Sequence, residues 1–119
     1  MIKGMHGMFY SNDAEATREF FRDKLDFDAT DVGDGWLIFD MPEADLGVHP
    51  TDPDGEQTPE PGTASVSFYC EDIESSVAEL KSRGVEFVRD VEDEGFGFVA
   101  YIAVPGGITV QLYEPKYDR

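Results

Sequence analysis

The sequence has few basic residues and a single cysteine, and each of these limits the partners or the cellular compartment that we expect for the protein. Lys and Arg account for only 9 of its 119 residues, against 26 Asp and Glu, which gives a formal net charge of −17. A field of that sign repels phosphate backbones, so we expect neither nucleic acid nor an anionic membrane as a partner. The lone Cys70 cannot form an internal disulfide, which agrees with a reducing compartment.

Long apolar runs are also missing. No stretch approaches the roughly 20 apolar residues of a membrane span, and the first ten residues do not resemble a signal peptide. We therefore expect a soluble, cytoplasmic protein. The sequence also lacks a Ser-His-Asp arrangement, a phosphate-binding glycine loop and a Cys/His metal spacing, so it gives no support to a hydrolase, a nucleotide-binding protein or a zinc finger.

Apolar and aromatic residues are present in sufficient number for one core. The hydrophobic fraction is 40%, with nine Phe, five Tyr and one Trp, and a chain of this length fits a single domain. The acidic residues are spread along the whole chain. Two explanations for this acidity remain open. One is a halophilic surface, kept soluble by hydrated carboxylates in strong salt, and the other is an acidic site that selects a cationic ligand.

The chain repeats itself once. Phe9-Tyr10 is followed by Asp13 and an acidic helix start, and Phe68-Tyr69 is followed by Asp72 and another acidic helix start. The offset is 59 residues each time, about half of the chain. A long period that occurs twice indicates a duplicated supersecondary unit, since a solenoid needs three or more repeats.

Hydrophobic periodicity and turn residues predict the same element order in both halves, βαβββ. Asn12 is the expected N-cap of the first helix. The predicted elements of the first half are strand 4–11, helix 13–24 and strands 27–30, 36–40 and 45–49. Those of the second half are strand 64–70, helix 72–83 and strands 85–90, 98–104 and 108–113.

We therefore expect one domain over residues 1–119, made of a first module (1–50), a proline-rich linker (51–62) and a second module (63–119). Its fold class is α+β, with two βαβββ modules that form a curved mixed β-sheet around a cleft and carry their helices on the outer face. The halves would repeat because each supplies one wall of a cleft that neither encloses alone.

The period of two along a strand predicts which side chains face this cleft. Ile108, Val110 and Leu112 form an apolar row that should pack under a helix, and Leu46 and Val48 should do the same in the first half. The side chains of the opposite faces are the candidate ligand-binding residues: His6, Met8, Tyr10, Asp45, Ser65, Ser67, Tyr69, Gln111 and Tyr113.

The chain resembles the vicinal oxygen chelate superfamily, which comprises glyoxalases, bleomycin resistance proteins and extradiol dioxygenases. The resemblance rests on the paired βαβββ order, on His6 with Asp13 seven residues further on, on the aromatic helix REFFRDKLDF and on the closing PGGITVQLYEP. It covers essentially the whole chain. It implies a glyoxalase/bleomycin-resistance-like fold.

The resemblance also implies where a metal would bind. Enzymes of the superfamily hold a divalent ion through four cleft-facing side chains, one from the first and one from the last strand of each half. The matching positions here are His6, Gly47, Ser65 and Gln111. His6 is a strong ligand type and Gln111 a weak, neutral one. His49 lies two residues beyond Gly47 on the same face. If the strand register shifts so that His49 takes the position of Gly47, the ligand set for a divalent ion (Ni, Zn, Mn or Fe) is His6, His49 and Gln111; otherwise the resemblance implies no complete metal site.

Two functions follow from this resemblance, and both are carried forward. The first is a dimeric binding protein with a degenerate metal site, whose aromatic and acidic cleft sequesters a small organic molecule, with a cation as one alternative. The second is a metal-dependent enzyme, a glyoxalase-like lyase or a dioxygenase, that acts on a small oxygenated substrate. The sequence identifies no catalytic residue and leaves open whether the modules pair within or between chains.

Overall fold

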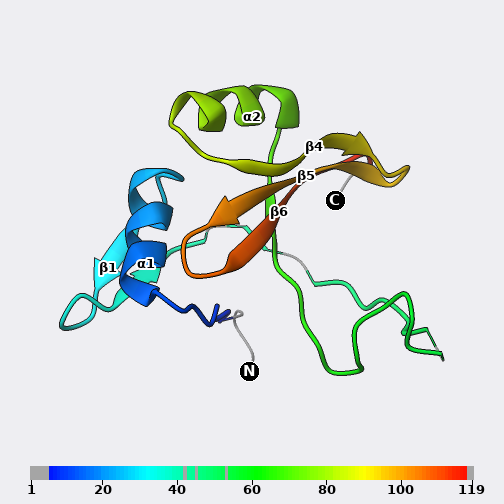
Figure 1. Ribbon diagram of the computed structural model, residues 1–119, viewed down its shortest axis with the longest axis horizontal. Helices are drawn as coiled ribbons and strands as arrows, with labels where there is room; N and C mark the ends of the chain where they lie inside the picture. The colour runs from blue at the N-terminus through cyan, green and yellow to red at the C-terminus, as the bar shows by residue number, and fades with distance from the viewer. Residues whose placement is uncertain (1–5, 42, 45, 53, 118–119) are drawn as a thin grey trace.

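The structure, a computed structural model, describes residues 6–41, 43–44, 46–52 and 54–117. Within these ranges it contains two helices and six strands (Figure 1). In chain order they are α1 (Ala14–Asp23), β1 (Ala29–Asp31), β2 (Leu37–Phe39), β3 (Ser67–Tyr69), α2 (Ile73–Ser82), β4 (Phe87–Asp93), β5 (Gly97–Val104) and β6 (Ile108–Pro115). Neither helix has the length and apolar character needed to cross a membrane.

The two helices begin 59 residues apart and end 59 residues apart, in keeping with the repeat in the sequence. Each follows an aspartate, Asp13 or Asp72, whose carboxylate accepts a hydrogen bond from a main-chain N–H of the first turn, at 3.1 and 3.4 Å. Such caps typically stabilise a helix by about 1 kcal/mol. The prediction of Asn12 as a cap was wrong, because Asn12 lies one residue too early and donates its main-chain N–H to the carbonyl of Gly106.

The second half forms the predicted βαβββ unit. Its four strands lie in the order β3-β6-β5-β4, with β3 parallel to β6 and the remaining pairs antiparallel. The helix α2 covers one face of this sheet (Figure 1). β3 is shorter than the predicted 64–70, and β4 begins later than predicted and continues to Asp93 with two register shifts.

Within its described residues, the first half contains α1 and, in place of a sheet like that of the second half, a short antiparallel hairpin of β1 with β2. The predicted strands 4–11 and 45–49 were wrong where they are described, since residues 6–11 and 46–49 have no strand structure. Leu46 and Val48 are 79% and 95% exposed and do not lie under a helix. In a first half built like the second, these two segments would pair with each other as β3 pairs with β6. Pro50, at the end of the second segment, has no N–H to donate to the hydrogen bonds of such a pair.

One apolar core nevertheless joins the two halves. The ring of Phe21, in α1, lies with its centroid between 5.6 and 5.9 Å from four other phenylalanine rings, those of Phe9, Phe27, Phe39 and Phe68. Phe21 also belongs to the buried cluster formed by α2 and the helix-facing side of the second sheet, which contains Ile73, Val77, Val85, Ala100, Ile102, Val104, Val110 and Leu112. The predicted burial of the row on β6 is confirmed, and the α+β class is as expected, with sheets that do not close.

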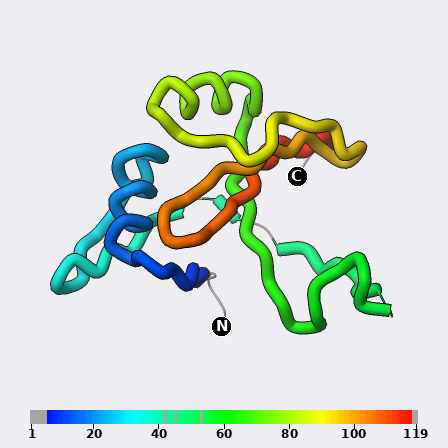
Figure 2. The backbone as a smooth tube through the Cα atoms, viewed as in Figure 1, coloured from blue at the N-terminus to red at the C-terminus, as the bar shows by residue number. Residues whose placement is uncertain are grey.

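The turn between β5 and β6 docks against the start of α1. Thr17 is buried, and its hydroxyl lies 2.5 Å from the carbonyl oxygen of Pro105 and 2.7 Å from the hydroxyl of Ser11. Gly106 allows this close approach, because a Cβ there would lie 1.8 Å from the Ser11 hydroxyl oxygen. By contrast, residues 54–66 run out from the body of the molecule as a long connection (Figure 2).

Candidate functional site

The face of the second sheet that points away from α2 carries an organised set of polar and aromatic side chains. The register places Tyr101 and Ser67 on either side of Gln111, and it places Tyr69 beside Tyr113. Because alternate residues of a strand point to opposite faces, these side chains lie opposite the buried row on β6. This surface, which we call the open face, is the candidate site.

A row of hydrogen bonds crosses three strands of the open face. The hydroxyl of Ser67 donates to Oε1 of Gln111 at 2.6 Å, and Nε2 of Gln111 donates to the hydroxyl oxygen of Tyr101 at 2.9 Å. Both ends of the Gln111 amide therefore have partners, which fixes its orientation. This row can present the Tyr101 and Ser67 hydroxyls to a ligand in a defined geometry.

Arg89 closes one end of this row. Its guanidinium lies 5.1 Å from the ring centroid of Tyr101, a cation–π distance. It also forms an ion pair with Glu92, and the hydrogen bond that the guanidinium donates to this carboxylate raises the pKa of Arg89. The guanidinium is thus neutralised within its own strand and adds little positive charge to the open face.

An aromatic cluster occupies the other end. The rings of Tyr69 and Tyr113 are stacked at 5.9 Å, and Phe96 lies 5.9 Å from Tyr113 in a tilted arrangement. The hydroxyls of Tyr113 and Tyr117 are 2.9 Å apart. Phe96 and Tyr117 remain about half exposed, so the cluster offers aromatic surface to a ligand.

Carboxylates lie next to this aromatic cluster. A cavity of about 510 Å³ beside Tyr69 is lined by Glu43, Glu71 and Glu114, together with Cys70 and Pro115. Glu114 is held in place because it accepts a hydrogen bond from the main-chain N–H of Ile73 at 2.8 Å. Aromatic faces beside carboxylates form the kind of surface that attracts organic cations.

The structure does not place the predicted residues of the first half on a sheet. His6, Met8 and Tyr10 lie in the irregular segment before α1, and Tyr10 is 90% exposed. Ser65 is exposed ahead of β3, and Asp45 lies outside the described residues. The register places Ser67, Tyr69, Gln111 and Tyr113 on the open face, and their role in ligand binding stays a prediction.

The predicted metal ligands come from different kinds of structure. Gln111 is in the middle of β6, whose neighbours are β3 and β5. His6 and His49 lie in irregular, exposed segments, and Nδ1 of His49 is 2.7 Å from the carbonyl oxygen of Pro50. Among the described residues, no group of three or more His, Cys, Asp or Glu side chains is arranged to hold a metal ion.

Sequence patterns alone assigned no face of the sheet to Tyr101, Arg89, Phe96 or Tyr117. The signal for Tyr101 was available, since Ile102 and Val104 are apolar and alternate with it along β5. Arg89 could not be placed in the same way, because the register shifts in β4 break the alternation. Phe96 and Tyr117 lie outside regular strand positions, where period-two reasoning does not apply.

The chain matches the family profile described as Glyoxalase/Bleomycin resistance protein/Dioxygenase superfamily over residues 5–112. No curated protein matches its sequence. The fold is similar to that of TnmS3, an antibiotic binding protein from Streptomyces sp. CB03234, at 20% identity and a TM-score of 0.62, covering 94% of this chain and 100% of that one.

Two further solved structures show the same likeness. One is a lactoylglutathione lyase from Agrobacterium tumefaciens, at 16% identity and a TM-score of 0.62, covering 89% of this chain and 88% of that one. The other is a superfamily member from Sphaerobacter thermophilus DSM 20745, at 23% identity and a TM-score of 0.58, covering 90% and 91%. At these identities the likeness shows the fold.

Proposed function

Because the chain belongs to the Glyoxalase/Bleomycin resistance protein/Dioxygenase superfamily, we propose that it binds a small organic molecule on its open face and sequesters it without chemical change. The observation that carries the proposal is the stack of Tyr69 on Tyr113 beside a carboxylate-lined cavity. A flat aromatic ligand would lie against these rings, and the carboxylates would favour a cationic one. The likeness to an antibiotic binding protein supports the same role.

The working unit in this proposal is a homodimer. The phenylalanines of the first half pack against the helix-facing side of the second sheet, so they do not cover the open face of their own chain. In a two-fold dimer the first half of a second copy would cover it. The proposed ligand-binding residues are then Ser65, Ser67, Tyr69, Gln111 and Tyr113 from one chain, with His6, Met8, Tyr10 and Asp45 from the other.

The proposal includes a degenerate metal site. A divalent ion usually takes about six donors, and the donors at the superfamily positions do not fit one. Oε1 of Gln111 already accepts a hydrogen bond from Ser67, and Nδ1 of His49 is engaged by Pro50. Ser65 and Gly47 offer no strong ligand. No step of the proposed function therefore passes through a metal.

The organisation and location of the protein complete the proposal. One domain would consist of a first module (1–50), a linker (51–62) and a second module (63–119), which the equal spacing of α1 and α2 supports. A cytoplasmic location is supported by the free thiol of Cys70, since a reducing compartment keeps such groups reduced.

Titration with proflavine, a planar aromatic cation, tests the binding role. We expect proflavine to bind, fluorescein (an anion of similar shape) not to bind, and Tyr113→Leu to weaken proflavine about five- to tenfold through the lost ring contact. Trp36→Leu is the control, since Trp36 is also half exposed but lies in the β1–β2 hairpin. Equal affinity of Tyr113→Leu and wild type would remove the open face as the binding site.

Metal analysis separates this proposal from the enzyme alternative. Protein purified without chelator should contain no stoichiometric Ni, Zn, Mn or Fe, and its melting temperature should not change when these ions are added. Near-stoichiometric metal that disappears in His6→Ala would instead support a metal-dependent lyase or dioxygenase with His6, His49 and Gln111 as ligands.

A further inference from the structure

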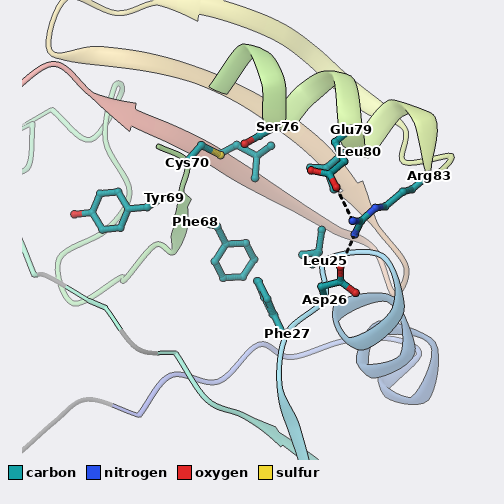
Figure 3. Close-up of a pocket in the computed structure, with 11 residues that line it drawn as sticks. Leu25, Asp26, Phe27, Phe68, Tyr69, Cys70, Ser76, Glu79, Leu80 and Arg83 are labelled. Carbon is teal, nitrogen blue, oxygen red and sulfur yellow. Dashed lines mark hydrogen bonds and ion pairs between the residues drawn. The ribbon is translucent and has the colours of Figure 1, made fainter. Parts of the chain in front are cut away.

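A second cavity, of about 270 Å³, lies on the other side of the second sheet from Gln111 and Tyr113, where the two helices come together (Figure 3). Its walls come from the residues that follow α1, from the later turns of α2, and from the helix-facing side of β3 and β6. Tyr69 lies at one edge of this cavity and is the residue that it shares with the proposed ligand-binding residues. The superfamily resemblance assigns nothing to the cavity.

The inner wall of this cavity is apolar. It consists of Leu25, Phe27, Phe68, Leu80 and Leu112. The first four are only partly buried although they pack against the core. A ligand that covered them would remove apolar surface from water, at about 25 cal/mol per Å². An engineered apolar cavity of about 150 Å³ binds benzene, so this one has room for a single ring with a short chain.

The rim of the cavity is charged and has an excess of one carboxylate. The guanidinium of Arg83 lies 3.1 Å from Oδ2 of Asp26 and 2.7 Å from Oε1 of Glu79 (Figure 3). Two carboxylates thus face one cation. Each carboxylate has about four lone-pair sites, so both can accept a further donor, and the net charge of −17 adds a field that attracts cations.

We propose that this cavity is a second ligand site, which takes a small ammonium compound with a one-ring apolar body. The ring would lie between Phe27, Phe68 and Leu80, and the ammonium would lie at Glu79 and Asp26. Charge complementarity at the rim selects an amine over a carboxylic acid of the same size, because Arg83 is already paired twice.

Cys70 provides a reporter, because it lines this cavity and is the chain's only cysteine. It also lines the carboxylate-lined cavity beside Tyr69, so variants are needed to assign the protection to one cavity. The probe is 2-phenylethylamine, with phenylacetate as a matched anion. The rate of thiol modification by methyl methanethiosulfonate is followed by intact mass at pH 8.5, where the amine is protonated. With a Kd of about 1 mM, 10 mM amine should slow the reaction about tenfold by mass action, and phenylacetate should slow it less than twofold.

Four variants locate the effect. Glu79→Gln should lose most of the protection, whereas Glu74→Gln, on the same helix but away from the cavity, should keep it. Leu80→Trp fills the cavity and should abolish protection, with retained folding checked by circular dichroism. Tyr113 does not line this cavity, so Tyr113→Leu should keep protection while it weakens proflavine. Failure of the proposed function and failure of this inference are therefore distinguishable.

The proposal is overturned if the amine gives no protection, or if phenylacetate protects Cys70 equally well. It is also overturned if Glu79→Gln and Glu74→Gln behave alike. Protection that rises with protein concentration in the absence of amine would show instead that a second copy of the chain covers the cavity.

Discussion

Lys24 and Arg83 each donate a side-chain hydrogen bond to the main-chain carbonyl oxygen of the other, at 2.7 and 2.8 Å. They are 59 residues apart and hold the same position, the C-cap of α1 and of α2. The last carbonyls of a helix lack intrahelical donors and carry partial negative charge. A cationic side chain from the other helix supplies both a hydrogen-bond donor and a compensating positive charge, so this contact stabilises the packing of the two halves.

Arg83→Met should lower the free energy of unfolding by about 1–2 kcal/mol, because it removes a charged hydrogen bond and two partly exposed ion pairs. Lys24→Met removes one exposed hydrogen bond and should cost about 0.5–1 kcal/mol. Urea denaturation at a fixed protein concentration measures both. Arg22→Met is the control, since the exposed Arg22 forms its ion pair with the adjacent Asp23 and should change stability less than Lys24→Met does. An Arg83 variant as stable as the Arg22 variant would contradict this account of the contact.

Gly106→Ala should destabilise the protein by about 2–4 kcal/mol, since it combines a steric clash with an unfavourable backbone conformation. The new Cβ would lie 1.8 Å from the Ser11 hydroxyl, at a φ of +101°. Gly95→Ala separates the two causes, because Gly95 also has a positive φ, of +87°, but faces open space; it should cost only about 1 kcal/mol. Thermal unfolding followed by circular dichroism gives both values. Similar losses for the two variants would mean that docking of this turn on α1 contributes nothing.

The melting temperature should rise by about 5–10 °C between 50 mM and 2 M NaCl, because salt screens repulsion among the excess carboxylates. Screening is nearly complete at 1 M, where the Debye length is about 3 Å. An equal osmolality of sucrose, which does not screen, is the comparison. A flat or falling response in NaCl would count against the halophilic explanation and leave selection of a cationic ligand as the reason for the acidity.

The carboxyl of Asp93 should titrate below the ordinary value of about 3.9. Its pKa is lowered first by the hydrogen bond from Lys116, at 2.6 Å, and then by the main-chain N–H of Gly95, at 2.8 Å. The folded state thus binds this proton less tightly than the unfolded state, so ionised Asp93 contributes stability above the unfolded pKa, and that contribution is lost as pH falls through the folded pKa. A carboxyl NMR titration checks this. Lys116→Met should move the midpoint upward, and an unmoved midpoint would rule out Lys116 as the main cause.

The second half was predictable because its local patterns agree with its tertiary structure. Val110 and Leu112 alternate with Gln111 and Tyr113, and the strand that carries them has a partner on each side. The alternation then gives the correct face for each residue. The helices were predictable for a similar reason, since their apolar spacing is encoded within each segment, although the cap of α1 is Asp13 and not the predicted Asn12.

The first half was predicted less well because strand formation depends on a distant partner. Leu46 and Val48 alternate as a strand would, but alternation assigns a face only if a ladder forms. The contact between Lys24 and Arg83 also could not be read from either helix alone, because each residue satisfies a carbonyl on the other. The offset of 59 residues was the available clue, since it marked the two as equivalent.

Identical subunits that meet across a two-fold axis exchange contacts reciprocally, whereas unrelated parts of one polypeptide have no reason to do so. The reciprocal hydrogen bonds between Lys24 and Arg83 are therefore the contact expected if an ancestral homodimer became a single chain by gene duplication and fusion. The two halves now differ: in the described part of the chain, the second has a four-stranded sheet and the first has its helix with one hairpin.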